Sequence, residues 1–160
     1  MHARTRIFLG ILAAGIATTT AAWAANNGYH GSLCNPVWPA DVEKLKYDKL
    51  GVSNISPDKV ALITCGALPT VSSNVNKVEA FVYDKDPAAD ICCTVSIQKL
   101  DGDIIASAKK CSSGFGSLSQ TLSYGLPANA VGTMSMVCSI PPENANGTSR
   151  VMSYRVETIP

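Results

Sequence analysis

Apolar and polar residues alternate in short runs along most of this chain, a pattern typical of β-strands that bury one face. Residues 77–84 show the alternation most clearly. One face of that run takes Val78, Ala80 and Val82, and the other takes Glu79, Phe81 and Tyr83. Comparable runs predict further strands at residues 59–65, 91–100, 103–110, 118–124, 131–140 and 150–157.

Two of these runs also predict which side chains point the same way. In the run at 118–124 the shared face takes Leu118, Gln120, Leu122 and Tyr124, and in the last run it takes Met152, Tyr154 and Val156. Turn-forming residues separate the runs, among them Pro69, Asp86-Pro87, Asp101-Gly102, Ser113-Gly114, Pro141-Pro142 and Asn146-Gly147. About seven short strands with regular turns predict an all-β fold, a single antiparallel β-sandwich or jelly-roll-like domain over residues 51–160.

The first 50 residues lack this alternation. Residues 25–50 contain Gly, Asn and Pro and are expected to form an irregular lead-in, and the apolar spacing of residues 41–50 loosely fits a short helix after Pro39. Residues 1–24 have the form of a secretory signal peptide: a basic start with Arg4 and Arg6, an apolar run, and Ala-Trp-Ala before a predicted cleavage at Ala25. The apolar run is too short to span a bilayer, which needs about 20 residues.

Cleavage of the signal peptide would change the length and the net charge of the chain. Removing residues 1–24 leaves 136 of the 160 residues, one domain by size, without a membrane-spanning stretch. Arg4 and Arg6 leave with the signal, so 11 Lys and Arg residues face 12 Asp and Glu residues. That balance does not predict binding to nucleic acid or anionic lipid, which requires clustered basic residues. We expect a periplasmic or extracellular protein.

Six cysteines in an exported chain predict three disulfides, and one pairing follows from geometry. Asp101-Gly102 is typical of a two-residue hairpin turn, and with that turn Cys92 faces Cys111. Facing Cα atoms lie about 4.5–5.5 Å apart, within disulfide reach. Counting outward from the turn places the pair at a hydrogen-bonded site. We therefore predict a Cys92–Cys111 bridge.

The other pairings are less constrained. Cys93 points to the opposite sheet face from Cys92 and needs another partner, for which we favour Cys138, with Cys34 then joined to Cys65. A strained Cys92–Cys93 ring is the alternative. A zinc site is not expected, because the chain has no C-x-x-C pair and His30 is its single histidine after residue 24.

Several short segments occur in an order similar to that of a group of secreted bacterial proteins, mostly uncharacterised. They are Gly51-Val52-Ser53-Asn54, the stretch 60–68 with Cys65-Gly66, the strand at 78–84, Cys93-Thr94-Val95, the strand at 118–122, Cys138-Ser139-Ile140-Pro141 and Tyr154-Arg155-Val156-Glu157. The resemblance implies four shared cysteines, which match Cys34, Cys65, Cys93 and Cys138, and so makes Cys92 and Cys111 an added pair. It implies no activity.

Aspartates supply the sharpest candidate for a metal site. Asp84, Asp86 and Asp90 lie in one loop, and Asp101 and Asp103 flank another, as oxygen ligands for calcium would. The run lacks the glycine and distal glutamate of an EF-hand, and Asp-Pro and Asp-Gly also form ordinary turns. We favour the turn interpretation and predict no metal site and no cofactor.

Catalytic motifs are also missing. His30 falls in the expected lead-in, no G-x-S-x-G segment is present, and paired cysteines leave no thiolate nucleophile. We therefore expect a non-catalytic binding or structural role at the cell surface or outside the cell, with a carbohydrate or protein ligand. Possible stacking residues for a sugar are Tyr29, Trp38, Tyr47 and Tyr124. The alternatives are a small extracellular hydrolase with a carboxylate pair, and a protease inhibitor.

Overall fold

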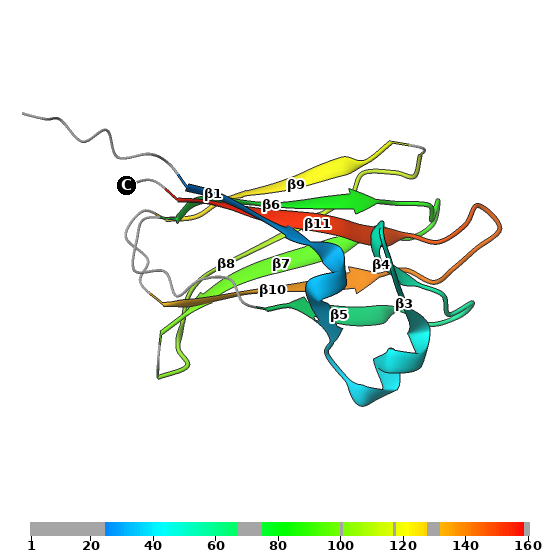
Figure 1. Cartoon of the computed structure of the whole chain (residues 1–160), viewed down its shortest axis with the longest axis horizontal. Helices are drawn as coiled ribbons and strands as arrows, with labels where there is room; N and C mark the ends of the chain where they lie inside the picture. Colours follow the sequence, from blue (N-terminus) through cyan, green and yellow to red (C-terminus); the bar gives the residue numbers. More distant parts are fainter. Residues whose placement is uncertain (1–24, 67–74, 100, 117, 128–131, 159–160) are drawn as a thin grey trace, which may run out of the picture.

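Two antiparallel β-sheets pack face to face in a computed structural model that describes residues 25–66, 75–99, 101–116, 118–127 and 132–158 (Figure 1). The all-β sandwich predicted from the alternation is confirmed. The described residues hold eleven strands rather than about seven. The predicted signal peptide lies outside the described residues.

Sheet A has the order β3-β4-β11-β6-β9, and β1 pairs with β11 off that path. Its strands are β1 (Ala25–His30), β3 (Leu45–Asp48), β4 (Gly51–Asn54), β6 (Val75–Tyr83), β9 (Gln120–Gly125) and β11 (Arg150–Thr158). Sheet B has the order β2-β5-β10-β7-β8. Its strands are β2 (Cys34–Pro36), β5 (Ala61–Cys65), β7 (Cys92–Gln98), β8 (Ile104–Cys111) and β10 (Thr133–Ile140).

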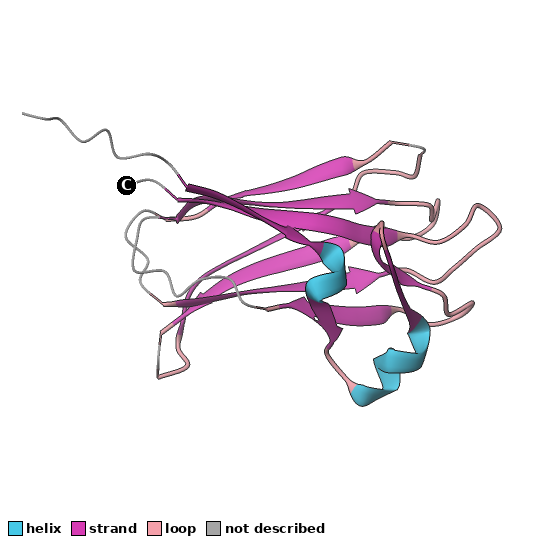
Figure 2. Ribbon diagram, viewed as in Figure 1, coloured by secondary structure: helices cyan, strands magenta, loops and turns pink. Residues whose placement is uncertain are grey.

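The core lies between the sheets and takes alternate residues of the central strands. Val78, Ala80 and Val82 of β6 are fully buried, as their alternation predicted, and the core also includes Ile63, Val95, Met136, Tyr124 and Tyr154. The helical content in Figure 2 consists of two short 3-10 turns, η1 (Gly31–Leu33) and η2 (Pro39–Lys44). Among the described residues, no helix is long and apolar enough to cross a membrane.

All six cysteines are paired, and the three predicted bridges are confirmed. They are Cys34–Cys65, Cys92–Cys111 and Cys93–Cys138. The first and third lie in the core, whereas the second lies on the outer side of sheet B, where Cys111 is exposed. Three disulfides in a domain of this size are typical of proteins that fold in an oxidising compartment.

The hairpin that carries Cys92 and Cys111 differs from its predicted geometry. Lys99 donates its backbone N–H to Asp103 (2.9 Å), so the turn is longer than the two residues Asp101-Gly102. A register shift beyond Ile97 compensates for the extra residue and keeps Cys92 opposite Cys111. Ser112 donates its backbone N–H to Ile91 (2.8 Å), which makes the neighbouring pair the hydrogen-bonded one. The prediction of a hydrogen-bonded site for the bridge was therefore wrong, and the bridged Cα atoms lie only 4.0 Å apart.

The expected irregular lead-in at residues 25–50 is instead part of both sheets. β1 pairs with β11, β2 with β5 and β3 with β4. The loosely fitted helix at 41–50 was also wrong, because residues 45–48 form β3 and only a 3-10 turn precedes them. Leu45 is buried, but Val42 and Leu50 are 56% and 52% exposed, so the apolar residues share no buried helical face.

A bulge interrupts the alternation of β11. The register against β6 shifts between Val151 and Ser153, so that Val151, Tyr154 and Val156 enter the core while Met152 is left half-buried. The prediction that Met152 shares the face of Tyr154 was therefore wrong. The first residue predicted for the strand at 118–124 was wrong as well, because Leu118 precedes β9 and is 78% exposed.

At the bulge, β1 and β4 meet end to end along the same edge of β11. On the same side of β11, β1 pairs with residues 153–158 and β4 pairs with residues 150–151. Gly51 begins β4 with a φ of 121°, and a Cβ atom there would lie 2.1 Å from the carbonyl oxygen of Val151. Only glycine allows both this conformation and this approach.

Candidate functional site

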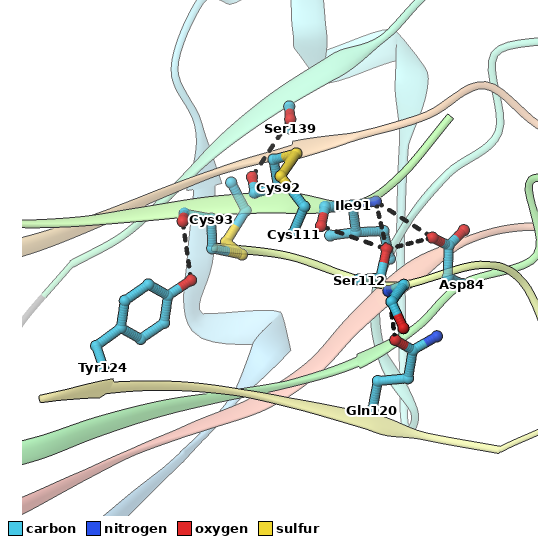
Figure 3. The surroundings of a disulfide bond; sticks show 11 residues. Asp84, Ile91, Cys92, Cys93, Cys111, Ser112, Gln120, Tyr124 and Ser139 are labelled. Carbon is cyan, nitrogen blue, oxygen red and sulfur yellow. Dashed lines mark hydrogen bonds between the residues drawn. A yellow bond between two sulfur atoms is a disulfide. The ribbon is translucent and has the colours of Figure 1, made fainter. Parts of the chain in front are cut away.

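The aspartates that the sequence suggested as calcium ligands organise turns. Asp84 is fully buried, and its carboxylate accepts hydrogen bonds from the Ser112 hydroxyl and the backbone N–H of Ile91 (Figure 3). It also accepts hydrogen bonds from the Ser149 hydroxyl and the backbone N–H of Asp86. These four donors occupy both oxygens and tie three loops together.

The remaining aspartates of the two loops also accept backbone hydrogen bonds. Asp86 accepts from the backbone N–H groups of Ala88 and Ala89, Asp101 accepts from that of Asp103, and Asp90 is exposed. Among the described residues, no group of three or more His, Cys, Asp or Glu side chains could hold a metal ion. Turn formation accounts for the hydrogen bonds of these aspartates.

Asn54 plays a similar structural role. Its amide nitrogen donates to the carbonyl oxygens of Lys59, Ile140 and Pro141 at 2.7–3.0 Å, and its side-chain oxygen accepts the N–H of Ser56. Asn54-Ile55-Ser56 matches the sequence required for N-glycosylation, but Asn54 is fully buried, so this sequon is inaccessible in the folded protein. The Gly51–Asn54 segment therefore serves the fold.

The aromatic residues proposed as sugar-stacking platforms are scattered. Tyr124 is buried and donates its hydroxyl to the carbonyl of Cys93 (2.8 Å), and Tyr29 stacks on Tyr154 with ring centroids 5.1 Å apart. Trp38, just before η2, is 61% exposed, and Tyr47 on β3 is 43% exposed. The structure does not bring these four residues together.

A different pair of aromatic residues lies on the solvent side of sheet A. Phe81 and Tyr83 are neighbours on β6, opposite in direction to the buried Val82, and both are half-buried. The pairing of β6 with β11 surrounds them with charged and small polar residues. We call this the β6–β11 face, and it consists of Lys77, Glu79, Phe81, Tyr83, Arg150, Ser153 and Arg155.

A hollow of about 280 Å³ lies at one end of the β6–β11 face, lined by Leu50, Tyr83, Arg150 and Met152. The β11 bulge is what leaves Met152 there, and the β3–β4 hairpin supplies Leu50. The Arg150 guanidinium lies 3.7 Å from the Asp48 carboxylate, and its Nε has no hydrogen-bond partner. The hollow thus combines an aromatic ring, apolar walls and an incompletely paired cation.

A buried carboxylate organises the other end of the face. Glu79 is 5% exposed, and it accepts hydrogen bonds from Arg155 Nε (2.7 Å) and forms an ion pair with Lys77 Nζ (2.5 Å). The hydrogen bond from Lys77, with that from Arg155, outweighs burial and lowers the pKa of Glu79 below its usual value. The Arg155 guanidinium also lies 5.6 Å from the centre of the Phe81 ring. Glu79 therefore fixes two cations over the sheet.

A larger hollow, about 550 Å³, lies beside the loop between β8 and β9. Its lining residues are Ser113, Phe115, Gly116, Leu118, Ser119 and Gln120, none of which is charged. The Gln120 side chain holds this loop, accepting the backbone N–H of Ser113 and donating to the carbonyl of Gly114. We prefer the β6–β11 face as the candidate site, because a few charged groups among apolar walls are what orient a bound ligand.

The sequence contained a signal for this site, although the four aromatic residues suggested as sugar contacts did not include Phe81 or Tyr83. Phe81 and Tyr83 fall on the polar face of the most regular alternation in the chain, together with Glu79. Two aromatic residues that share a strand face with a glutamate are unusual enough to mark a candidate surface. Arg150 and Arg155 could not be placed beside them, because strand pairing across some 70 residues is not visible in the sequence.

Comparison with solved structures supports the fold. The chain is similar to a family two carbohydrate esterase from Cellvibrio japonicus, with a TM-score of 0.50 and 9% identity over 86% of this chain. The match covers 35% of the esterase, so the chain spans about a third of its length.

Two carbohydrate-binding domains show similar values. A low-affinity xylan-binding module from Roseburia intestinalis matches with a TM-score of 0.49 and 11% identity over 84% of this chain and 96% of the module. The CBM36-1 domain of a multidomain xylanase from the hindgut metagenome of Trinervitermes trinervoides has a TM-score of 0.49 and 8% identity, covering 85% of this chain and 99% of that domain. At such identities the likeness concerns the fold alone. The sequence matches no protein-family profile and no curated protein.

Proposed function

We propose that this protein is an exported, non-catalytic carbohydrate-binding domain whose ligand lies on the β6–β11 face. The observation that carries the proposal is the hollow around Tyr83. Pyranose rings have apolar C–H faces that pack on aromatic side chains, and hydroxyls that accept hydrogen bonds from guanidinium groups. Tyr83 offers the first kind of contact, with Met152 and Leu50 as apolar walls beside it, and Arg150 offers the second.

The rigidity of the site supports a binding role. Tyr83 and Arg150 face each other across paired strands rather than on loops, and β4, β1 and β9 pair with these two strands on either side. A preorganised surface loses little conformational entropy when it binds a ligand. A shallow hollow of this size would cover one or two sugar units, so we expect weak binding to any single site on a polymer.

The acid–base groups favour binding over hydrolysis. A general acid needs a pKa near or above the working pH, whereas ion pairing lowers that of Glu79. The carboxylate of Asp84 is enclosed by four donors, and His30 lies exposed on β1 with its Nε2 3.1 Å from the carbonyl oxygen of Lys49. These surroundings suit structural roles for all three residues.

Affinity electrophoresis against soluble polysaccharides, followed by calorimetry, tests the proposal. The panel includes a neutral β-glucan, xylan and polygalacturonate. Replacing Tyr83 with alanine should weaken binding about tenfold, as expected for the loss of an aromatic stacking contact of about 1–1.5 kcal/mol.

Trp38→Ala is the matched control, because Trp38 is an exposed aromatic residue outside the β6–β11 face and its loss should leave binding unchanged. Retardation of the Tyr83→Ala variant equal to that of the wild type would disprove the location of the site. A wild-type protein that none of the polymers retards would disprove the function.

A further inference from the structure

Cationic side chains gather on and around the β6–β11 face. Lys77 and Arg155 lie at one end, and Arg150 and Lys85 at the other. The adjacent β3–β4 hairpin adds the exposed Lys46 and Lys49. The acidic residues on the same face and hairpin are Asp48, Glu79 and Glu157. Asp84 and Asp86 flank Lys85, but Asp84 is buried among four hydrogen-bond donors and Asp86 accepts two backbone N–H groups of its own loop. Because acidic residues slightly outnumber basic ones after residue 24, this positive surface is local and not a reflection of overall charge.

The negative charge of Glu79 does not neutralise the positive charge of the whole face. The two oxygens of Glu79 are engaged by Arg155 and Lys77, so one carboxylate is shared between two cations. Glu157, opposite Lys77 on β11, balances the remaining charge at this end. The excess positive charge of the face lies at the end with Arg150 and Lys85. Arg155 and Lys77 stay partly exposed, with 37% and 38% of their side-chain surface open to solvent. A ligand carboxylate could therefore reach them without breaking the internal pair.

Each aromatic ring of the face already holds a cation. Lys85 Nζ lies 4.8 Å from the centre of the Tyr83 ring, and the Arg155 guanidinium lies 5.6 Å from that of Phe81. A neutral sugar that stacked on these rings would have to compete with the cations. A sugar that carries a carboxylate can instead bind the aromatic ring and the cation together. The aromatic ring then contacts the face of the sugar, and the cation contacts its carboxylate.

The two cationic ends are separated along a straight strand. Lys77 and Tyr83 are six positions apart on β6, about 20 Å at roughly 3.3 Å per residue. That distance exceeds a single sugar, so a ligand that contacts both ends must be an oligomer or polymer with repeated charges. Resting on the function proposed above, we infer that the ligand is an anionic polysaccharide built from uronic acids, lying along β6 with its carboxylates at Arg150 and Lys85 and at Arg155 and Lys77.

Polygalacturonate and its methyl ester test this inference with one backbone in two charge states. The oxidised wild-type protein should bind polygalacturonate about fivefold or more tighter than the ester, and added NaCl should remove the difference. Alginate provides a second uronic polymer. Lys85→Gln should weaken binding to both acidic polymers about two- to fivefold, the range expected for one exposed ion pair.

Lys109→Gln is the matched control, since it removes the same charge from an exposed position on sheet B. Equal binding of acid and ester, with Tyr83→Ala weakening both, would overturn the inference and leave carbohydrate binding intact. Equal losses in Lys85→Gln and Lys109→Gln would also overturn it, because the attraction would then come from general charge. Failure to bind any polymer would remove the proposed function itself.

Discussion

The Cys92–Cys111 disulfide stabilises the domain mainly by restricting the unfolded chain, and its removal gives a quantitative prediction. Replacing both cysteines with alanine removes little packing, because Cys111 is exposed and Cys92 only half-buried. The bridge spans a sequence separation of 19 residues. Chain-entropy scaling for a loop of that length gives about 11 cal/mol/K, so the free energy of unfolding should fall by about 3 kcal/mol at 25 °C.

Urea unfolding followed by circular dichroism measures this change, with the Cys93–Cys138 bridge as the internal comparison. That bridge spans 45 residues and joins two fully buried positions, so the same relation gives about 4 kcal/mol before any cavity cost is added. A loss below about 1 kcal/mol for the outer bridge, or a larger loss for the outer than for the inner one, would refute the reasoning. Ligand binding should survive removal of the outer bridge, which lies on the opposite sheet from the β6–β11 face.

Two further predictions concern the backbone and pH. Gly51→Ala should cost at least about 2 kcal/mol in thermal unfolding, because its Cβ would meet the carbonyl of Val151, whereas Gly28→Ala, with open space around it, should cost less than about 0.5 kcal/mol. Equal costs would contradict the packing argument. The lowered pKa of Glu79 stabilises the fold above the unfolded value near 4.5, and that stability is lost as pH falls through the folded pKa. Wild-type protein should therefore lose more stability on acidification than Glu79→Gln, and parallel pH curves would contradict the ion-pair assignment.

The sequence predicted the strands whose alternation is local and long. β6 and the β7–β8 hairpin were found because each carries its own pattern, and the Cys92–Cys111 register followed from a nearby turn. β1 to β4 were not found, since they are 3–6 residues long and all but β3 contain Gly, Asn or Pro. β1 and β4 pair with β11 and β2 pairs with β5, all of which lie well along the chain, and β3 pairs with β4.

The candidate site was less predictable than the fold. The alternation placed Phe81 and Tyr83 on one face with Glu79, but the hollow beside Tyr83 depends on the β11 bulge, and a single extra residue is invisible in a pattern of apolar positions. The motifs behind the family resemblance proved to be structural contacts. Asn54 binds carbonyls of β10 and the following loop, and the Tyr154 hydroxyl donates to the carbonyl of Gly66 (3.0 Å). These segments contribute to the fold rather than to the β6–β11 face.

The pairing of the first described strand with the last has a mechanical consequence. Ala25 and Thr158 are partners at one end of the β1–β11 ladder, so a force that pulls these two residues apart acts across the strands and opens the hydrogen bonds one pair at a time. Such unzipping would release residues 25–30 before the load reaches the first covalent link at Cys34. The first described strand should therefore detach at low force, however high the resistance of the domain to urea or heat.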